Sequence, residues 1–395
     1  MDERKKINVG VICKENPYDR RPQSGTTFQV FKALSRQNDL NVFWIPFNDS
    51  FLSKFWLNFQ KLISKALRIT MPGDRSPLYI RLKEKSIDKE MLSKADVLYC
   101  PFTQLISVEK PTVYMSDALF HSMINYYWEA DVEARSVKIG DRTQQLVLDH
   151  ATKIVLPSQW AIDTALGYYH QSPNKVSLAE YGPNIDEKDI VPHSWSYGEH
   201  LHILFLGVDW QRKGGVKAVE ACRWLNENGV KSTLHIVGTP YLDERIKELD
   251  FVDYVGFLNK NDRKQYECLK GVIAQCHCML LPTEAECAGI AFCESTANGL
   301  PCFSYHTGGI PNYVLNGKNG YLLSISASGE DFGKKIKDCL VSGELERMSK
   351  TCLDVYNTVL NWNVWARKTA KALVQAINEY GYPIFTEKDL SLIHI

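Results

Sequence analysis

The chain has no excess of either charge, because its 46 Lys and Arg residues are matched by 46 Asp and Glu residues. A protein without net charge has no overall field that attracts a phosphate backbone, so we expect no nucleic-acid partner. Apolar residues make up 45% of the chain and charged residues 23%, which is typical of globular proteins and excludes extensive disorder. A length of 395 residues exceeds that of most single domains and favours two of them.

Long apolar runs are also missing, since no stretch approaches the roughly 18 apolar residues of a membrane-spanning helix. The charged residues 2–6 lead directly into the short run Ile7–Ile12, which differs from the long apolar stretch of a secretory signal. The 11 cysteines are odd in number and lie mostly in apolar segments, a pattern of buried free thiols in a reducing compartment. We therefore expect a cytoplasmic protein, and contact with the inner face of the membrane is an open alternative.

Metal-binding patterns are absent or incomplete. The sequence contains no Asp-x-Asp motif. The triplet Cys276-His277-Cys278 has no second pair of ligands at zinc spacing and leads into a predicted strand, which favours a position in the core. We expect neither a metal nor a cofactor, because cationic side chains and a helix N-terminus can stabilise an anionic leaving group.

Short apolar runs alternate with segments of helical spacing along most of the chain, which is typical of strand–helix units on a parallel sheet. The first series of predicted strands is Ile7–Cys13, Leu40–Ile45, Val97–Cys100, Thr112–Met115 and Lys153–Leu156. The second series is Leu201–Leu206, Ser232–Val237, Phe251–Gly256, Cys278–Leu281, Cys302–Tyr305 and Tyr321–Leu323. The stretch between the two series is rich in Gly, Pro, Asp and Ser and is typical of a hinge.

These patterns predict an α/β protein with two Rossmann-like, doubly wound domains at about 1–190 and 196–364. Residues 365–395 are expected to hold a C-terminal helix that returns to the first domain, since Val364–Tyr380 has helical spacing and no strand follows it. Ligands of doubly wound sheets bind beyond the carboxyl ends of the strands. We therefore expect the chemistry in strand-to-helix loops that face a central cleft.

The most informative segment is an acidic loop with a glycine, which follows the predicted strand Cys278–Leu281. A helix is expected to begin at Ile290 and Ala291, whose unpaired N–H groups form an anion site suited to a diphosphate. Gly289 permits close approach of a ligand to the backbone. Helical spacing then continues to about residue 298.

Two carboxylates, Glu286 and Glu294, would flank this anion site. Carboxylates cannot attract a diphosphate, but they accept hydrogen bonds from sugar hydroxyls on either side of it. A nucleoside diphosphate sugar has a sugar, a diphosphate and a ribose in that order. The alternative, in which Glu284, Glu286 and Glu294 are solvated surface charges, is open when the pair is considered alone.

Further motifs accompany this pair. They are Ala297–Pro301, Gly308–Pro311, the loop Leu204–Gly215 after the first strand of the second series, Val155–Ser158, Tyr181–Asp186, His235–Gly238, Asn316–Gly320 and Trp362. Together with Glu286-x7-Glu294 they resemble glycosyltransferase family 4, retaining enzymes of the GT-B fold, over nearly the whole chain. The resemblance implies a hexosyltransferase whose first domain binds an acceptor and whose second domain binds a nucleotide sugar.

The implied reaction transfers a sugar, with retention at the anomeric carbon, from a UDP-sugar, or alternatively a GDP-sugar, to a hydroxyl acceptor. The acceptor would be lipid-linked or a protein, in polysaccharide, glycolipid or glycoprotein assembly of the bacterial type. The resemblance implies that Lys213 contacts the donor diphosphate, Glu294 the ribose and Glu286 a hydroxyl of the transferred sugar. Gly289, Ile290 and Ala291 would offer backbone donors.

This sequence departs from the family at two positions. Val208 stands where the family has an arginine, and we expect Arg212 to supply the positive charge that the leaving diphosphate needs, an exposed loop charge being the alternative. Asp117 stands where the family presents a histidine to the sugar, and His121 follows one helical turn later. We expect Asp117, and after it His121, to contact the sugar or the acceptor. For His121 a core or helix-face position is the alternative.

Two features of the first domain leave alternatives open. Gly25 lies between the first strand and the predicted helix 29–36, where it would let the loop approach the donor phosphate or form an ordinary turn. Segment 51–71 has apolar and aromatic residues at helical spacing, together with several Lys and Arg residues and no acid. A helix of this kind either lies in the surface of an anionic membrane or buries its apolar stripe in the domain.

Two other functions are compatible with the same features. A nucleotide-sugar epimerase or hydrolase on this fold would consume the donor without an acceptor. A non-catalytic donor-binding subunit would bind the nucleotide without releasing it from any sugar donor, and it is suggested by the departures at Val208 and Asp117.

Overall fold

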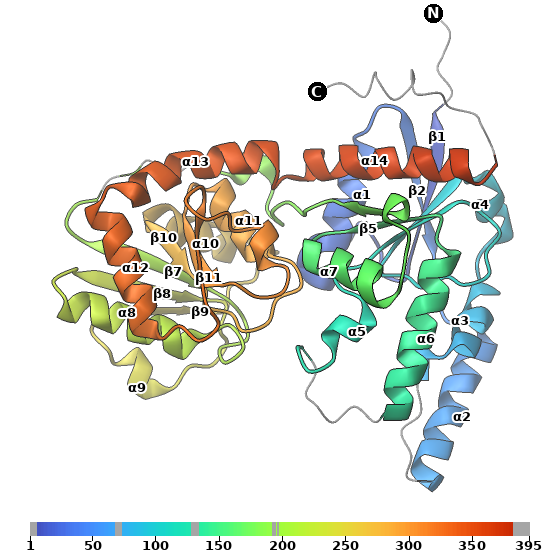
Figure 1. Ribbon diagram of the computed structural model, residues 1–395, viewed down its shortest axis with the longest axis horizontal. Helices are drawn as coiled ribbons and strands as arrows, with labels where there is room; N and C mark the ends of the chain where they lie inside the picture. Colours follow the sequence, from blue (N-terminus) through green and yellow to red (C-terminus); the bar gives the residue numbers. More distant parts are fainter. Residues whose placement is uncertain (1–5, 68–72, 128–133, 192–194, 196, 382–395) are drawn as a thin grey trace, which may run out of the picture. The chain divides into compact units, whose positions relative to one another are not determined.

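The computed structural model describes residues 6–67, 73–127, 134–191, 195 and 197–381. The chain forms two compact units, one that runs to Ala179 and resumes at Trp362, and one that comprises Glu180–Asn361. Each unit contains a six-stranded sheet whose paired strands are all parallel, with helices packed around it (Figure 1). The predicted α/β class and the two doubly wound domains are confirmed.

The sheet of the first unit has the order β2-β1-β3-β4-β5-β6. Its strands are β1 (Ile7–Cys13), β2 (Leu40–Pro46), β3 (Val97–Pro101), β4 (Thr112–Met115), β5 (Lys153–Leu156) and β6 (Val176–Leu178). Its helices are α1 (Thr26–Ser35), α2 (Phe51–Leu67), α3 (Pro77–Glu84), α4 (Lys89–Lys94), α5 (Phe120–Met123), α6 (Ala134–His150), α7 (Gln159–Asp163) and α14 (Trp362–Glu379). The edge strand β6 was not predicted, because a strand of three half-buried residues is too short to show an alternation of apolar and polar residues.

The C-terminal helix α14 packs on β3, β4, β5 and α1 of the first unit. Its Trp365 is fully buried, and the Trp365 ring makes edge contacts with the rings of Tyr99 on β3 and of Trp362. The amphipathic spacing therefore places the helix on an existing sheet, where its apolar side covers the central strands. Residues 382–395 lie outside the described part of the chain.

The chain first passes from one unit to the other after Ala179, whereas we expected the boundary at about residue 190. The backbone N–H of Tyr181 donates to the Tyr313 hydroxyl at 3.2 Å, and the Cys293 thiol donates to the Tyr181 carbonyl at 3.3 Å. These bonds attach the segment after Ala179 to the second unit. At the other crossing, the Asn361 side chain donates to the Tyr356 carbonyl at 2.7 Å and closes the end of the second unit.

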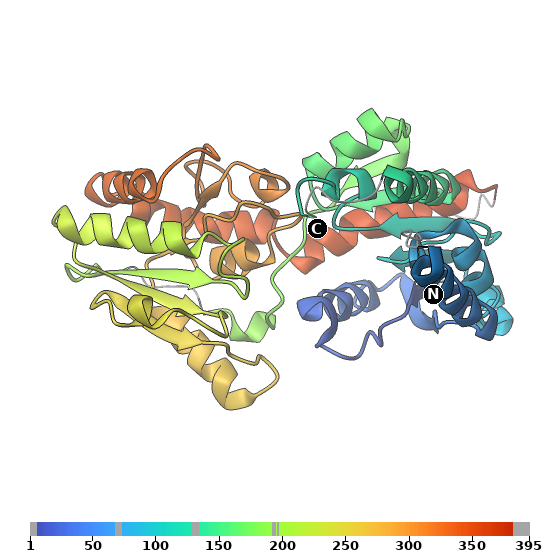
Figure 2. The same cartoon turned by 90° about the horizontal axis from the view of Figure 1, so that it is seen from below.

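The second sheet has the order β12-β11-β10-β7-β8-β9. Its strands are β7 (Leu201–Leu206), β8 (Ser232–Val237), β9 (Val252–Gly256), β10 (Cys278–Leu280), β11 (Cys302–Tyr305) and β12 (Gly320–Leu323). Its helices are α8 (Gly215–Glu227), α9 (Glu244–Lys247), α10 (Arg263–Gln275), α11 (Ile290–Ala297), α12 (Gly329–Val341) and α13 (Glu344–Thr358). Figure 2 shows α8 and α12 on one face of this sheet and α10 on the other. The strand order reverses between β7 and β10, so the topological switch point lies there.

The cysteines are free and all except Cys268 are buried, as their apolar surroundings predict. Cys276 and Cys278 are fully buried, which confirms a core position for this pair. Burial raises the pKa of the Cys302 thiol to about 12. Such thiols stay protonated near neutral pH and act as small apolar residues.

A row of polar side chains crosses three neighbouring strands of the second sheet. The Nδ1 atom of His202 on β7 lies 2.9 Å from Nε2 of the buried His235 on β8, and Nδ1 of His235 lies 2.7 Å from a carboxylate oxygen of Asp253 on β9. His200 stacks on His202, with ring centroids 4.5 Å apart. Burial and the adjacent imidazoles of His235, His200 and His277 lower the pKa of His202 from 6.5 to about 4, and Asp253 opposes this shift.

We expect the protein to lose stability as the pH falls from 6.5 towards 4. In this window an unfolded chain protonates His202 and the folded protein does not, so the unfolded state binds more protons and acid favours unfolding. His202→Gln should flatten this dependence, because glutamine keeps a polar group in the row but does not titrate. Thermal unfolding between pH 7 and pH 5 measures the effect, with His306→Gln at an exposed position as the control. Equal slopes in all three proteins would contradict the expectation.

Candidate functional site

The candidate site is built from two loops at the switch point of the second sheet. Strands β7 and β10 are parallel neighbours, with Ile203 beside Cys278 and Leu204 beside Met279. The loop 207–214 connects β7 to α8, and the loop 281–289 connects β10 to α11. Because both loops leave the carboxyl ends of adjacent strands, the two segments predicted from the sequence meet at one edge of the sheet.

The two loops are joined through their backbones. The carbonyl of Arg212 accepts a hydrogen bond from the N–H of Glu284 at 2.9 Å and another from the hydroxyl of Thr283 at 3.2 Å. Gly214 has a φ of 74°, and a Cβ atom at this position would lie 2.0 Å from the carbonyl oxygen of Pro282. No side chain fits there, so the close approach of the loops requires this glycine.

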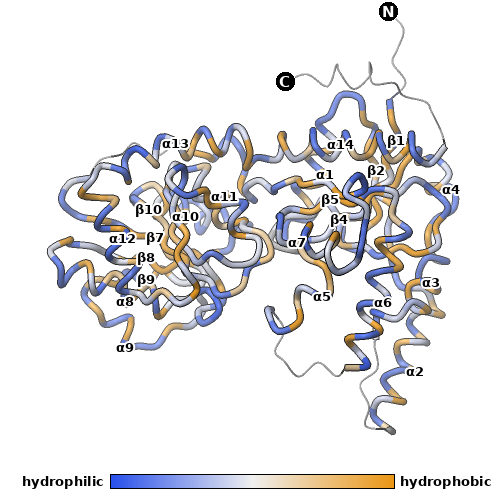
Figure 3. Tube along the Cα trace, viewed as in Figure 1, coloured by the Kyte–Doolittle hydropathy of each residue, from blue (hydrophilic) through white to orange (hydrophobic). Residues whose placement is uncertain are grey.

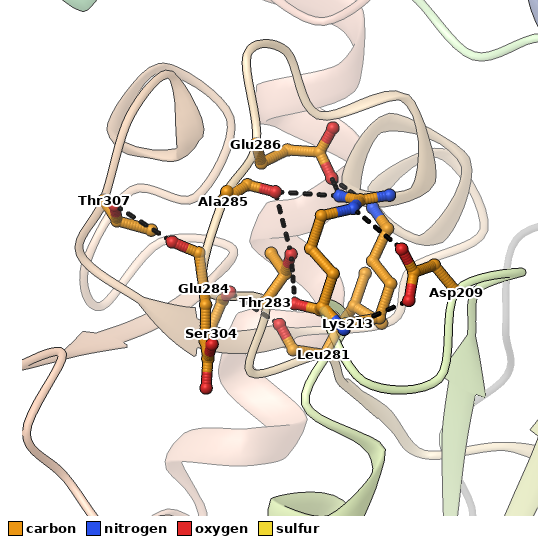
Figure 4. A network of polar contacts seen from close by, with 10 residues as sticks. Asp209, Lys213, Leu281, Thr283, Glu284, Ala285, Glu286, Ser304 and Thr307 are labelled. Carbon is orange, nitrogen blue, oxygen red and sulfur yellow. Dashed lines mark hydrogen bonds and ion pairs between the residues drawn. The ribbon is translucent and has the colours of Figure 1, made fainter. Parts of the chain in front are cut away.

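The charged groups of the two loops pair directly (Figure 4). The ammonium of Lys213 donates to the Glu286 carboxylate, and both side chains are mostly buried. A guanidinium nitrogen of Arg212 lies 3.8 Å from the same carboxylate oxygen and donates to the carbonyl of Ala285 at 2.8 Å. Arg212 also contacts Asp209 at 3.3 Å. Arg212 is thus held beside Lys213 and is not an isolated charge on an exposed loop.

Helix α11 begins at Ile290, as predicted, and its first backbone bond runs from the N–H of Cys293 to the carbonyl of Gly289 at 2.9 Å. The N–H groups of Ile290 and Ala291 belong to the first turn, where an α-helix supplies no acceptor. Both residues are half-buried, in the same loop and helix as Glu286. This arrangement can bind an anion through backbone N–H groups and adjacent cationic side chains.

Gly289 is also required by the protein's own packing. A Cβ atom there would lie 2.6 Å from the ring of Phe292 and 2.9 Å from the ring of Tyr313. The sequence suggested that this glycine admits a ligand. In the structure, the aromatic rings behind the loop already exclude any side chain, which is a second reason for glycine.

The second carboxylate, Glu294, is almost completely buried on α11 and pairs with the ammonium of Lys260. Lys260 lies in the loop between β9 and α10 and was not found from the sequence. A buried carboxylate needs a cationic or hydrogen-bonding partner, and in the sequence this requirement was the only indication that a residue such as Lys260 pairs with Glu294. Because several loop lysines follow strands of this sheet, the signal did not identify which one.

Three predicted site residues, Gly25, Asp117 and His121, belong to the first unit. Gly25 forms the N-cap of α1 with a φ of 93°, a conformation that suits glycine in a turn before a helix. Asp117 is half-buried in the loop after β4. Gly25 and Asp117 therefore both lie beyond the carboxyl ends of strands in the first sheet, as expected.

The histidine His121 has partners within its own unit. Its Nδ1 atom lies 3.2 Å from a carboxylate oxygen of Asp141, and its ring stacks on Tyr168 with the centroids 3.4 Å apart. The Tyr168 hydroxyl donates to Asp141 at 2.8 Å, and desolvation together with this bond raises the pKa of Tyr168 to about 12. The Tyr169 hydroxyl donates to the second oxygen of Asp141 at 2.9 Å. These contacts correspond to the helix-face alternative for His121.

Over the described ranges, no three or more His, Cys, Asp or Glu side chains are grouped so that they could hold a metal ion. The positive charge at the switch point comes from Arg212 and Lys213. An anion at this site would therefore contact guanidinium, ammonium and peptide N–H groups.

Residues 187–351 match the sequence model of the family described as "Glycosyl transferases group 1". The N-acetyl-alpha-D-glucosaminyl L-malate synthase of Bacillus anthracis is 35% identical over 80 residues, which cover 20% of each chain. The chain spans less than half the length of the curated relatives that it matches, between 20% and 44%.

Two solved structures show the same fold at low sequence identity. WaaG, described as a glycosyltransferase involved in lipopolysaccharide biosynthesis, has a TM-score of 0.60 at 14% identity, with 93% of this chain and 99% of that chain covered. Anabaena Alr3699/HepE in complex with UDP and glucose has a TM-score of 0.58 at 14% identity, with 93% and 99% covered. The architecture that we expected from the resemblance, GT-B, is confirmed.

The contact between the loops at Gly214 predicts a specific sensitivity to substitution. Gly214→Ala should lower the free energy of unfolding by about 2 kcal/mol or more, because the methyl group would collide with the Pro282 carbonyl. Gly229→Ala is a matched control, since Gly229 has a φ of 80° and nothing within 4 Å of its Cβ position. The control should cost only about 1 kcal/mol of backbone strain. Denaturant unfolding measures both variants, and equal losses would show that the loops are not in close contact.

Proposed function

We propose that this chain, whose residues 187–351 match the group 1 glycosyl transferases, transfers a sugar from a nucleoside diphosphate sugar to a hydroxyl acceptor with retention at the anomeric carbon. The observation that carries the proposal is the Lys213–Glu286 pair beside the first turn of α11. It joins a cation, a carboxylate and unpaired N–H groups at the switch point of a doubly wound sheet, where such sheets bind nucleotides.

In the proposed complex, the donor diphosphate binds the N–H groups of Ile290 and Ala291. Lys213 turns from Glu286 to a phosphate oxygen, and Arg212 adds positive charge from the same loop. This exchange gives Lys213 a new anionic partner, while Glu286 replaces its ion pair with Lys213 by a hydrogen bond from a sugar hydroxyl and keeps the Arg212 guanidinium 3.8 Å away. Arg212 thereby replaces the arginine that the family has at the position of Val208.

The carboxylates bind the two ends of the donor. Glu286, released from Lys213, accepts a hydrogen bond from a hydroxyl of the transferred sugar. Glu294 accepts hydrogen bonds from the ribose hydroxyls, while Lys260 holds its carboxylate in place and compensates its charge. Carboxylates bind hydroxyls at fixed positions, so the pair orients the anomeric carbon relative to the acceptor.

The reaction breaks the bond between the anomeric carbon and the phosphate oxygen and forms a bond from that carbon to the acceptor oxygen on the same face. The acceptor proton passes to the departing phosphate oxygen. Negative charge grows on the diphosphate during this step, and Lys213, Arg212 and the first turn of α11 stabilise it. These groups supply the charge stabilisation without a divalent cation. We assign Asp117 to contact with the sugar or the acceptor in the first unit.

We propose a UDP-sugar as the donor, a GDP-sugar being the alternative. The similarity to HepE of Anabaena, whose solved structure contains UDP and glucose, supports the preference for a UDP-sugar over a GDP-sugar. We place the acceptor hydroxyl in polysaccharide or glycolipid assembly, since WaaG is described as acting in lipopolysaccharide biosynthesis. The reaction would take place on the cytoplasmic side of a membrane.

Release of nucleoside diphosphate from a panel of UDP- and GDP-sugars, measured with and without membrane extracts as a source of acceptor, tests the proposed function. We expect release with one donor that depends on the acceptor, and a product with an α or β linkage matching that of the donor. Release without any acceptor would indicate a hydrolase or an epimerase. Binding of the nucleotide without release from any donor would indicate a non-catalytic subunit.

Removal of the ammonium of Lys213 should weaken donor binding. We expect Lys213→Ala to raise the dissociation constant of UDP by about tenfold or more, because a charge-assisted bond to the diphosphate is lost. Lys217→Ala is the control, since Lys217 is a half-exposed lysine on α8 that pairs with Glu220. Isothermal titration with UDP measures both, and equal affinities for UDP would refute the role of Lys213.

Removal of the Glu286 carboxylate should separate binding from transfer. Glu286→Ala leaves Lys213 free for the diphosphate, so we expect the affinity for UDP to stay equal or to increase. Turnover should fall by about a hundredfold or more, because the transferred sugar loses its anchor. Glu284→Ala, an exposed neighbour in the same loop, should retain normal turnover. Loss of UDP affinity in Glu286→Ala would contradict the proposed exchange of partners.

A further inference from the structure

Helix α2 (Phe51–Leu67) exposes five large apolar side chains to solvent, while Trp56, Leu57 and Ile63 are half-buried. The exposed fractions are 82% for Phe51, 49% for Leu52, 61% for Phe55, 41% for Phe59 and 65% for Leu62. The two completely buried residues of the same helix, Ser53 and Gln60, are polar. An ordinary surface helix buries its apolar side, whereas the apolar stripe of α2 that contains Phe51, Phe55 and Leu62 is exposed.

Polar contacts hold the helix in the first unit. The side chain of Gln60 donates to the carbonyl of Gly73 at 3.1 Å, and the indole N–H of Trp56 donates to the hydroxyl of Ser76 at 3.2 Å. Helix α2 packs on α3 and on the turn Gly73–Arg75. Of the two alternatives that the sequence left open, the structure excludes burial of the whole apolar stripe in the domain.

The charges of α2 form a row beside the apolar stripe. Successive residues of a helix advance by about 100°, so Phe51, Phe55 and Leu62 share one side, and the lysines at 54, 61 and 65 share the adjacent one. No acidic residue occurs between Phe51 and Leu67. Figure 1 shows α2 at the margin of the first unit, beside α3, and Figure 3 shows apolar and polar residues alternating along it. These exposed apolar residues and the three lysines together form the basic-apolar face of α2.

We propose that the basic-apolar face of α2 docks this protein onto a lipid bilayer with anionic headgroups. Aromatic and aliphatic side chains in one stripe can enter the boundary between headgroups and acyl chains, while an adjacent row of lysines pairs with anionic headgroups. A second copy of the chain is a poorer partner, because its α2 would bring three more lysines and no acid. The charge of the helix therefore selects an anionic surface.

The helix lies along the surface and does not cross the bilayer. None of the helices in the described ranges is long and apolar enough to span a membrane. At about 1.5 Å per residue, α2 is roughly 25 Å long, which suits contact with a surface along its whole length. Docking would hold the first unit, to which we assign the acceptor, next to lipid-linked hydroxyls. The docking itself does not depend on the donor chemistry.

Co-sedimentation of the full chain with vesicles tests the proposal. We expect binding to vesicles that mix phosphatidylglycerol with phosphatidylcholine, and little binding to phosphatidylcholine alone. The triple variant Phe55→Ser, Phe59→Ser, Leu62→Ser should lose at least about tenfold in affinity, since its insertable side chains are gone. The variant Lys54→Glu, Lys61→Glu, Lys65→Glu should lose binding to the anionic vesicles, by about fivefold per lysine at low salt.

Matched controls exist for both variants. Tyr241→Ser with Val341→Ser removes exposed apolar groups of the second unit, and Lys85→Glu with Lys89→Glu reverses exposed charges elsewhere in the first unit. Both controls should bind vesicles like the unchanged protein, and all variants should keep its melting temperature. The affinity for UDP should not change in the α2 variants, which separates this test from that of the donor site.

Four results would overturn the proposal. The first is no binding of the unchanged protein to anionic vesicles. The second is equal binding to neutral and anionic vesicles, and the third is binding that survives both α2 variants. The fourth is a concentration-dependent dimer, detected by sedimentation velocity, that the triple apolar variant abolishes while vesicle binding persists. That result would show that a second copy of the chain covers the stripe.

Discussion

The adjacency of β7 and β10 is the constraint on which the candidate site depends. Pairing of these strands sends two loops out at the same edge of the sheet, and the lack of a side chain at Gly214 lets their backbones touch. Only at this separation can Lys213 in one loop reach Glu286 in the other. The charge pair is thus a consequence of strand order, and it would not form if β10 occupied another place in the sheet.

Sequence periodicity predicted most strands because the strands of a covered parallel sheet are short apolar runs bounded by loops. The site loops could be predicted as well, since doubly wound sheets place ligands beyond the strand ends. The pairing of Lys260 with Glu294 could not, because the two residues are 34 positions apart and only the fold joins them. Nor could the exposure of α2, because periodicity gives the same stripe whether its partner is a sheet or solvent.

Each of the two carboxylates of the candidate site forms an ion pair with a lysine of the same unit. Lys213 neutralises Glu286 and Lys260 neutralises Glu294, so the carboxylates expected to bind a sugar and a ribose carry no isolated charge in a partly dry site. In the proposed complex Lys213 moves to the diphosphate, and Glu286 replaces this ion pair by a hydrogen bond from a sugar hydroxyl. Because Lys213 is already mostly buried, its transfer offsets part of the desolvation cost of binding an anion, and the released carboxylate favours ligands that carry hydroxyls as well as a diphosphate.

A crystal structure of the protein in complex with UDP would test most directly the claim that the first turn of α11 and Lys213 bind the donor diphosphate. The predicted result is a diphosphate whose oxygens accept hydrogen bonds from the N–H groups of Ile290 and Ala291, with the Lys213 ammonium turned from Glu286 to a phosphate oxygen. A diphosphate bound away from the first turn of α11, or one bound there while Lys213 stays on Glu286, would contradict it.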